Sequence, residues 1–216
     1  MNEHALPLTY AHHAPRRASG SDAPLLILLH GRGTDENDLA GLLQFLDPRF
    51  EAVSIRAPYP FEYGGYTWFA LDETIGRYDR AQLDEGLKGI LDVVQKESGT
   101  GRKVFLYGFS MGAMMALAAS LTHPELFRGC VAHSGLVPEQ ADHLSIDWKR
   151  IGSCAFFIAH GTYDPVVSVD YARRGRELFS HTDAQFLYRE YPMGHEISPE
   201  SLRDTSDWLT SLIDRA

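Results

Sequence analysis

Short apolar runs alternate with amphipathic stretches along the chain, and this alternation constrains the fold more than any other feature of the sequence. Runs of aliphatic and β-branched residues predict strands, and several are apolar on both faces, as buried parallel strands are. The predicted strands span residues 24–30, 50–57, 103–109, 129–135, 154–160 and 184–191. Because parallel strands need crossover connections, the pattern predicts an α/β fold in which helices cover a mostly parallel sheet.

Apolar residues at helical spacing predict helices in stretches that begin after Asn37, after Asp79, at Ser110 and at Ser198. After Asp79, Gln82 is placed to complete a capping box and Gly99 offers a stop. Ser198 and Pro199 form a good cap and first-turn pair for the last helix. The opening residues 6–15 fit either a short edge strand or a hairpin.

Length and composition bound the kind of protein. The chain has 216 residues, of which 44% are hydrophobic and 23% charged, so residues 1–216 are expected to form a single domain. A formal charge of −9, with no run of Lys and Arg, argues against a nucleic-acid partner. The N-terminal stretch lacks the apolar core of a secretory signal, and the longest aliphatic run, 25–29, is too short for integral membrane association. We therefore expect a cytoplasmic protein.

Residue types that bind metals or cofactors form no recognisable pattern. The histidines at 11–13 and elsewhere lack the spacing of a zinc site, so no metal is expected. Neither a dinucleotide-binding fingerprint nor a phosphate-binding Walker loop is present, so no cofactor is expected. Cys130 and Cys154 lie in apolar segments and are interpreted as core residues, although a single disulfide between them stays open. The sequence also leaves open whether the chain forms a homodimer.

Ser110 lies in a Gly-x-Ser-x-Gly motif between a predicted strand and a predicted helix. This context predicts a tight turn that exposes the serine as a nucleophile, with Gly108 and Gly112 required where side chains would collide with backbone. The alternative is a serine with a purely structural role in a turn. A hydroxyl is a weak nucleophile by itself, so the chemistry also needs a base and a group that orients the base.

His195 is the best candidate for the base among the ten histidines. It follows the last predicted strand, in a loop at the carboxyl edge of the sheet, where Ser110 is also expected. His30, His133 and His160 end other predicted strands and stay open as alternatives. Because a histidine must be neutral to act as a base, we expect activity to rise with pH through roughly 6 to 7.

Asp164 is the candidate for the residue that orients His195. It follows the strand that ends at His160, again at the carboxyl edge, and a carboxylate there would hold the imidazole in the correct tautomer. The alternative is a turn aspartate before proline. Asp142 and Asp147 are the reserve candidates.

Backbone N–H groups are expected to bind the negative charge that develops on the substrate oxygen. One candidate is the N–H of Met111, at the start of the helix after the nucleophile. The other is the N–H of Arg32, because two flanking glycines allow the backbone to approach a ligand closely. Losing one such donor typically costs about 100- to 1,000-fold in rate.

Four motifs in this order, HGRGTDEND, GFSMGAMMAL, HGTYDPVV and GHEI, resemble the phospholipase/carboxylesterase family of α/β-hydrolases. The family includes acyl-protein thioesterases and small bacterial carboxylesterases, and the resemblance extends from about residue 24 to the end of the chain. It implies the α/β-hydrolase fold, with helices on both faces of the sheet. It also implies a catalytic triad of Ser110, Asp164 and His195, and oxyanion donors at Arg32 and Met111.

The resemblance also places a substrate loop within 57–78, a long segment without clear periodicity. Trp68, Phe69 and Leu71 would then line the substrate site together with Val167, whereas without the resemblance these residues fit core packing equally well. Eukaryotic acyl-protein thioesterases usually have Gln after the nucleophile and Leu in the first loop. This chain has Met111 and Arg32, which looks more like the bacterial carboxylesterase branch.

The sequence as a whole favours a serine carboxylesterase that hydrolyses short- or medium-chain esters through an acyl-enzyme. A small-molecule ester is thus the expected partner. The alternative within the same chemistry is a lysophospholipase or acyl thioesterase. A hydrolase fold that binds small ligands without catalysis is a further alternative, although such a fold would normally lack a triad member.

Overall fold

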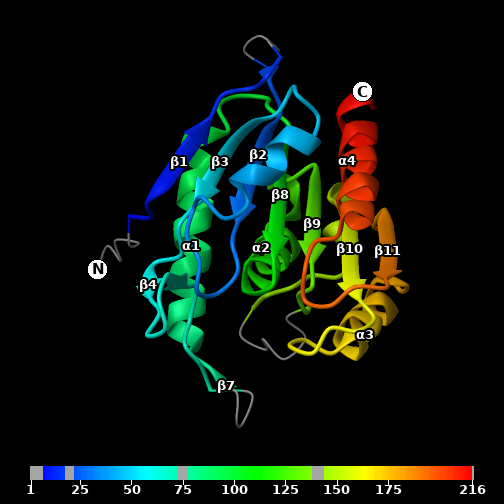
Figure 1. Ribbon diagram of the computed structural model, residues 1–216. Helices are drawn as coiled ribbons and strands as arrows, with labels where there is room; N and C mark the ends of the chain where they lie inside the picture. The colour runs from blue at the N-terminus through cyan, green and yellow to red at the C-terminus, as the bar shows by residue number, and fades with distance from the viewer. Residues whose placement is uncertain (1–6, 18–21, 73–76, 138–143, 216) are drawn as a thin grey trace.

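The computed structural model describes residues 7–17, 22–72, 77–137 and 144–215 (Figure 1). Its main feature is a seven-stranded sheet with the order β1-β3-β2-β8-β9-β10-β11. The strands are β1 (Tyr10–His13), β2 (Leu25–Leu29), β3 (Glu51–Ile55), β8 (Val104–Phe109), β9 (Gly129–His133), β10 (Ala155–Gly161) and β11 (Phe186–Tyr191). Only β1 runs antiparallel to its neighbour. The chain therefore has the mostly parallel sheet that the sequence predicts, with residues 6–15 contributing an edge strand at Tyr10–His13.

Helices cover both faces of the sheet, as Figure 1 shows. They are α1 (Arg80–Glu97), α2 (Met111–Thr122), α3 (Val169–Phe179) and α4 (Pro199–Asp214). Alternate residues of β2 enter two separate cores: Leu25, Ile27 and Leu29 pack with α1 and α2, while Leu26 and Leu28 pack with α4. This division explains why β2 is apolar at every position.

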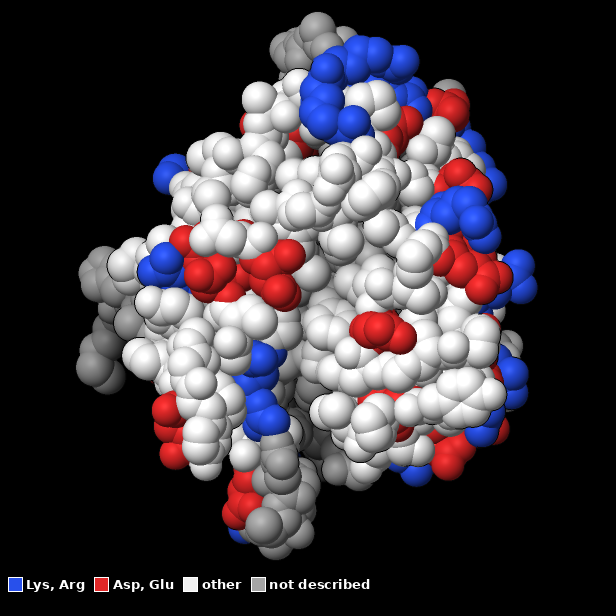
Figure 2. Space-filling model, in the orientation of Figure 1, with Lys and Arg blue, Asp and Glu red and all other residues white. Residues whose placement is uncertain are grey.

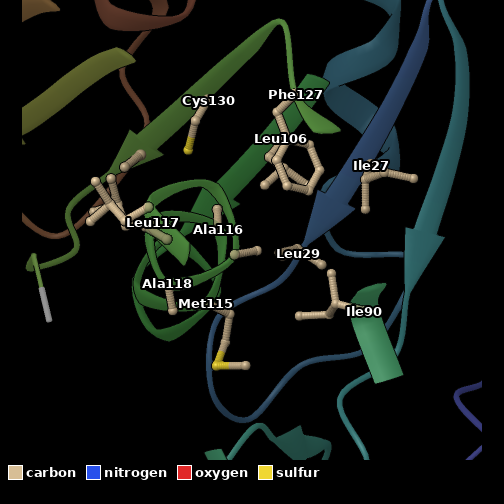
Figure 3. Close-up of a cluster of buried hydrophobic side chains, with 14 of the residues drawn as sticks. Ile27, Leu29, Ile90, Leu106, Met115, Ala116, Leu117, Ala118, Phe127 and Cys130 are labelled. Carbon is tan, nitrogen blue, oxygen red and sulfur yellow. The ribbon is translucent and has the colours of Figure 1, made fainter. Parts of the chain in front are cut away.

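The first of these cores depends on the small side chains of α2 (Figure 3). Ala116 is buried beside the larger Leu29 and Leu106 of the sheet, whereas Ala118 is buried on the side of the helix that faces away from the strands. Alanines allow the helix axis to approach the strands closely, and Figure 3 shows α2 lying directly against them. This close packing fixes the N-terminus of α2, and thereby Ser110, relative to the sheet.

One helical expectation needs correction, and one helix was not predicted. The stretch after Asn37 forms only a 3₁₀ helix, η2 (Ala40–Phe45), because the chain turns into extended backbone at Leu46. The helix that was not predicted from the sequence is α3, whose buried residues are Ala172, Gly175 and Phe179. Ala172 and Gly175 bury little apolar surface, so α3 contains few large apolar residues, although its buried residues lie on one face of the helix.

The cysteines and caps show how local chemistry fits the fold. Cys130 and Cys154 are buried free thiols, so the disulfide that the sequence left open is absent, and burial raises the pKa of Cys130 to about 12.

Asp79 caps α1 by accepting from the N–H of Gln82. The Gln82 side chain does not complete the capping box but accepts from the N–H of Ala70. It thereby ties residues 57–78 to α1.

Residues 57–78 form two short hairpins as far as they lie within the described ranges. The first pairs β4 (Tyr59–Pro60) with β5 (Tyr66–Thr67), and the second pairs β6 (Leu71–Asp72) with β7 (Arg77–Tyr78). Tyr66 joins the first hairpin to residues 33–34, since its carbonyl accepts from Gly33 and its N–H donates to Thr34. The segment is thus attached to the loop after β2. Its role as a substrate loop stays a prediction.

Charged groups are unevenly distributed on the face shown in Figure 2. Lys and Arg side chains lie at the upper end and right edge of this view and also at its left edge and lower centre, while Asp and Glu side chains form a patch left of the centre and a smaller group right of it. Within the described part of the chain, no helix is both long enough and apolar enough to cross a bilayer.

Candidate active site

The site forms where three strands end at the carboxyl edge of the sheet. Ser110 follows β8, Asp164 lies beyond β10, and His195 lies beyond β11. The Nε2 atom of His195 lies 2.9 Å from Ser110 Oγ, and its Nδ1 atom lies 2.7 Å from Asp164 Oδ2. Since a carboxylate only accepts, Nδ1 carries the proton and Nε2 presents its lone pair to the serine hydroxyl. This is the geometry in which a histidine can remove a proton from serine.

The turn at Ser110 is strained and tightly enclosed. Its backbone has φ 54° and ψ −119°, a conformation that residues with side chains rarely adopt. A Cβ atom on Gly108 would overlap the backbone of Gly112, and one on Gly112 would overlap the backbone of Leu29. Both glycines are therefore required to bring the turn this close to β2. The helix dipole of α2 points its positive end toward Ser110.

Asp164 is held by contacts on both carboxylate oxygens. Oδ1 accepts from the backbone N–H groups of Val166 and Val167, each at 2.8 Å, while Oδ2 accepts from His195. Burial by itself would raise the pKa of Asp164, but the hydrogen bonds from His195 and the two amides outweigh burial and lower that pKa. The carboxylate therefore stays ionised and can stabilise a protonated imidazole.

The loop that carries His195 is fastened to the end of β10. The N–H of Thr162 donates to Tyr191 O, and that of Tyr163 donates to Met193 O. The imidazole also contacts the ring of Phe109, with 5.0 Å between ring centroids, and its side chain is 17% exposed. The imidazole of His195 thus packs against Phe109, and part of its surface remains accessible to a small molecule.

The first candidate oxyanion donor, Met111, is the first residue of α2 and is buried. Its sulfur lies 3.3 Å from the Thr67 hydroxyl, whose single proton has a closer acceptor in the carbonyl of Phe69 at 2.8 Å, and the sulfur contact brings α2 against β5. The second candidate, Arg32, lies between Gly31 and Gly33 in the loop after β2. A Cβ atom on Gly31 would lie 3.5 Å from Ser110 Cβ, so this loop passes directly beside the nucleophile. Both donor roles stay predictions.

His30 organises the Arg32 loop, a role that the sequence did not reveal beyond its position at a strand end. Its Nε2 atom accepts from the N–H of Ala57, which leaves the proton on Nδ1 to donate to Gly31 O at 2.6 Å. Burial lowers the pKa of His30 and keeps the ring neutral. The indole N–H of Trp68 donates to the carbonyl of His30 at 2.9 Å. The loop is therefore fixed from both sides.

The predicted substrate residues are placed unequally. Trp68 and Phe69 are 0% exposed and belong to the main core, so in this structure they support the site from below. Leu71 is half-buried in β6. Val167 is half-buried and next to the triad, because its amide binds Asp164. Contact of any of the four with substrate stays a prediction.

The alternative bases and acids have other structural environments. His133 is fully buried and contacts the Thr205 hydroxyl at 2.9 Å, and burial together with nearby His160 lowers its pKa to about 3. His160 lies 3.4 Å from Asp164 and is taken up below. Asp147 accepts from the N–H of Lys149 within its own turn. Asp142 lies outside the described residues.

Comparisons with known proteins identify the family of the chain. The family model described as Phospholipase/Carboxylesterase matches residues 15–213. The chain belongs to this family. Acyl-protein thioesterase 1 of Mycosarcoma maydis is 27% identical over 217 residues, covering 87% of this chain and 90% of the relative.

Solved structures of an esterase and of a carboxylesterase have a similar fold. A structure of esterase PE8 is 28% identical and has a TM-score of 0.79, covering 96% of this chain and all of the other (100%). A carboxylesterase structure from Mesorhizobium loti is 22% identical with a TM-score of 0.81, and the match covers 97% of both chains. The proteins named here are a thioesterase, an esterase and a carboxylesterase.

Proposed function

We propose that this member of the phospholipase/carboxylesterase family is a serine carboxylesterase that hydrolyses short- or medium-chain carboxylic esters through an acyl-enzyme. The observation that carries the proposal is the unbroken chain of contacts from Asp164 through His195 to Ser110. The proposal includes residues 1–216 as a single catalytic domain that works in the cytoplasm without a cofactor.

In the first half of the reaction, His195 Nε2 removes the proton of Ser110 as Oγ attacks the ester carbonyl carbon. The imidazolium that forms is stabilised by Asp164, whose buried carboxylate contacts Nδ1 at 2.7 Å. The tetrahedral intermediate then collapses, the alcohol leaves with the proton from His195, and the acyl group stays on Ser110. Water repeats the sequence: it gives a proton to His195, attacks the acyl carbon and releases the acid, while Ser110 regains its proton.

The negative charge on the carbonyl oxygen is the largest electrostatic demand of this reaction. The N–H of Met111 meets it at the N-terminus of α2, where the helix dipole adds a positive potential. The N–H of Arg32 is the second donor, on the loop that passes beside Ser110. Both are main-chain groups, so the identity of the side chain at each position leaves the donor in place.

A thioesterase or lysophospholipase is the second candidate function. It uses the same acyl-enzyme, and the similarity to an acyl-protein thioesterase of Mycosarcoma maydis favours it. The two candidates differ only in leaving group and acyl chain. A substrate panel therefore separates them.

The first experiment tests the nucleophile with a fluorophosphonate probe, which forms a covalent bond with activated serines. We expect the native protein to be labelled and the Ser110→Ala variant to remain unlabelled. Labelling of both, or of neither under native conditions, would contradict the proposed mechanism. The second outcome would favour a ligand-binding protein without catalysis.

The second experiment identifies the substrate class. Hydrolysis rates are measured on nitrophenyl esters of increasing acyl length, with a lysophospholipid and an acyl-CoA in parallel, and with Ser110→Ala as the background control. We expect kcat/KM to be highest for a short or medium ester. A preference for the acyl-CoA or the lysophospholipid would establish the second candidate instead.

A further inference from the structure

His160 is a buried polar residue in an otherwise apolar strand. It is the sixth residue of β10, AFFIAHG, and its side chain is 0% exposed. Burial is the main cause that lowers the pKa of His160, so the ring is neutral and carries one proton. A buried imidazole needs partners to offset its lost hydration. Its partners identify its role.

The proton of His160 lies on Nε2. This atom is 2.8 Å from the carbonyl oxygen of Val167, and a carbonyl can only accept. The same atom lies 3.4 Å from Asp164 Oδ2, longer than a strong hydrogen bond but close enough for the N–H dipole to attract the carboxylate. Oδ2 is the oxygen that contacts His195. His160 thus faces the catalytic acid on the side opposite to the two backbone amides.

Val167 connects these contacts. Its N–H donates to Asp164 Oδ1, and its carbonyl accepts from His160. Both the N–H and the carbonyl of Val167 therefore have hydrogen-bond partners. The bond from Val167 N–H to Asp164 Oδ1 closes residues 164–167 into a loop around the carboxylate. Without the Nε2 proton of His160, the Val167 carbonyl would lose its partner, and the loop would keep, within the described residues, only the bond from Asp164 N–H to Gly161 O as a hydrogen bond to β10.

We propose that His160 is a positioning residue that holds the 164–167 loop and directs Asp164 Oδ2 toward His195. The inference rests on the proposed function, because it assigns His160 a role in the same site. His160 acts only through Asp164 and Val167 and does not touch the reacting atoms. Its removal should reduce the rate of the chemical step and leave substrate binding unchanged.

Two amide variants form a matched pair for the test. Gln places its amide nitrogen near the position of Nε2, whereas Asn places it near the position of Nδ1. The two variants therefore have the same chemistry and differ in where the donor lies. We expect His160→Gln to keep most of the native kcat and His160→Asn to lose about 10- to 100-fold, since small displacements of a catalytic group have effects of this size.

The measurements are kcat and KM on the best ester, with circular dichroism and thermal unfolding for each variant. KM should stay within about 2-fold of the native value in both variants, because uniform binding is not affected. Equal kcat values for the Gln and Asn variants, or a loss confined to KM, would overturn the proposal. So would a loss that follows the fraction of folded protein.

A measurement on the native protein does not depend on the folding of any variant. Nitrogen-15 NMR of the imidazole groups should show His160 as the neutral tautomer with its proton on Nε2; the other tautomer would overturn the proposal. The fluorophosphonate test remains separate. If the probe labels native protein through Ser110 while the His160 variants are fully active, the proposed function stands and the positioning role fails.

Discussion

Two serines at the ends of neighbouring strands share an unusual positive φ. Ser110 follows β8 with φ 54°, and Ser134 follows β9 with φ 52°; within the described residues they are the non-glycine positions with positive φ. Each is also held by the next strand of the sheet. The N–H of Ser110 donates to His133 O, and the N–H of Ser134 donates to Ala159 O.

Their side chains differ completely. The hydroxyl of Ser110 lies 2.9 Å from the imidazole of His195. The hydroxyl of Ser134 is buried and has no hydrogen-bond partner in the part of the chain that the structure describes. Gly135 then packs against Ala113 of α2, so the chain after Ser134 fills space behind the nucleophile. A positive φ is thus common to both serines, whereas only the hydroxyl of Ser110 has a neighbouring base that can activate it.

The largest expected effect concerns activity at the two serines. Ser110→Ala should reduce kcat by at least about 10⁴-fold, because the nucleophile is lost while the oxyanion donors remain. Ser134→Ala should stay within about 3-fold of native activity, since its hydroxyl touches no member of the triad. Steady-state kinetics on a nitrophenyl ester would measure both. Comparable losses at the two positions would contradict the assignment of Ser110 as the nucleophile.

A smaller effect concerns the pH dependence of stability and the residue before Ser134. At the end of β9 this residue is His133, whose pKa burial lowers to about 3, with His160 adding to the shift. Below about pH 6.5, His133 binds a proton in the unfolded chain but stays neutral in the folded protein. The contribution of His133 to the free energy of unfolding is therefore complete above that pH and decreases as the pH falls. Between pH 7 and pH 5 the free energy of unfolding should fall by about 2 kcal/mol from His133.

Urea unfolding at several pH values would measure this dependence. In His133→Gln the free energy of unfolding should vary less with pH than in the native protein. His181→Gln is the matched control, because His181 is exposed. If His133→Gln keeps the full native dependence, the acid sensitivity originates elsewhere.

The smallest expected effect is the release of backbone strain. Replacing Ser110 or Ser134 by Gly should raise the free energy of unfolding by about 1 kcal/mol, since glycine adopts positive φ without a steric penalty. Ala at the same positions keeps the strain and is the control. Denaturant unfolding of the four variants would give the comparison. A gain that Ala also produced would assign the effect to the lost hydroxyl instead of to the backbone.

The sequence predicts the sheet well because buried parallel strands are apolar on both faces. The same property makes the site predictable: parallel strands end at one edge, so residues after β8, β10 and β11 must lie near one another. Ser110, Asp164 and His195 are in contact in the structure, and their catalytic roles stay predictions until the serine and its partners are tested.

Other features depend on contacts that no local pattern encodes. His133 meets Thr205 across 72 residues of sequence, and Trp68 meets the carbonyl of His30. An aromatic residue in a loop looks the same in sequence whether it lines a pocket or fills a core. For that reason the sequence left Trp68 and Phe69 undecided between the two. The turn at Ser134 was likewise invisible, because serine is an ordinary residue after a strand.

The steric enclosure of the Ser110 turn has a consequence for directed evolution of this protein. Gly108 and Gly112 admit no side chain, so randomising them would mostly yield misfolded clones. The permissive positions are in the surrounding loops, such as Tyr163 and Val166, whose side chains are 73% and 65% exposed beside the acid. A combinatorial library that varies those loops and keeps the turn constant should sample new selectivities without losing the scaffold.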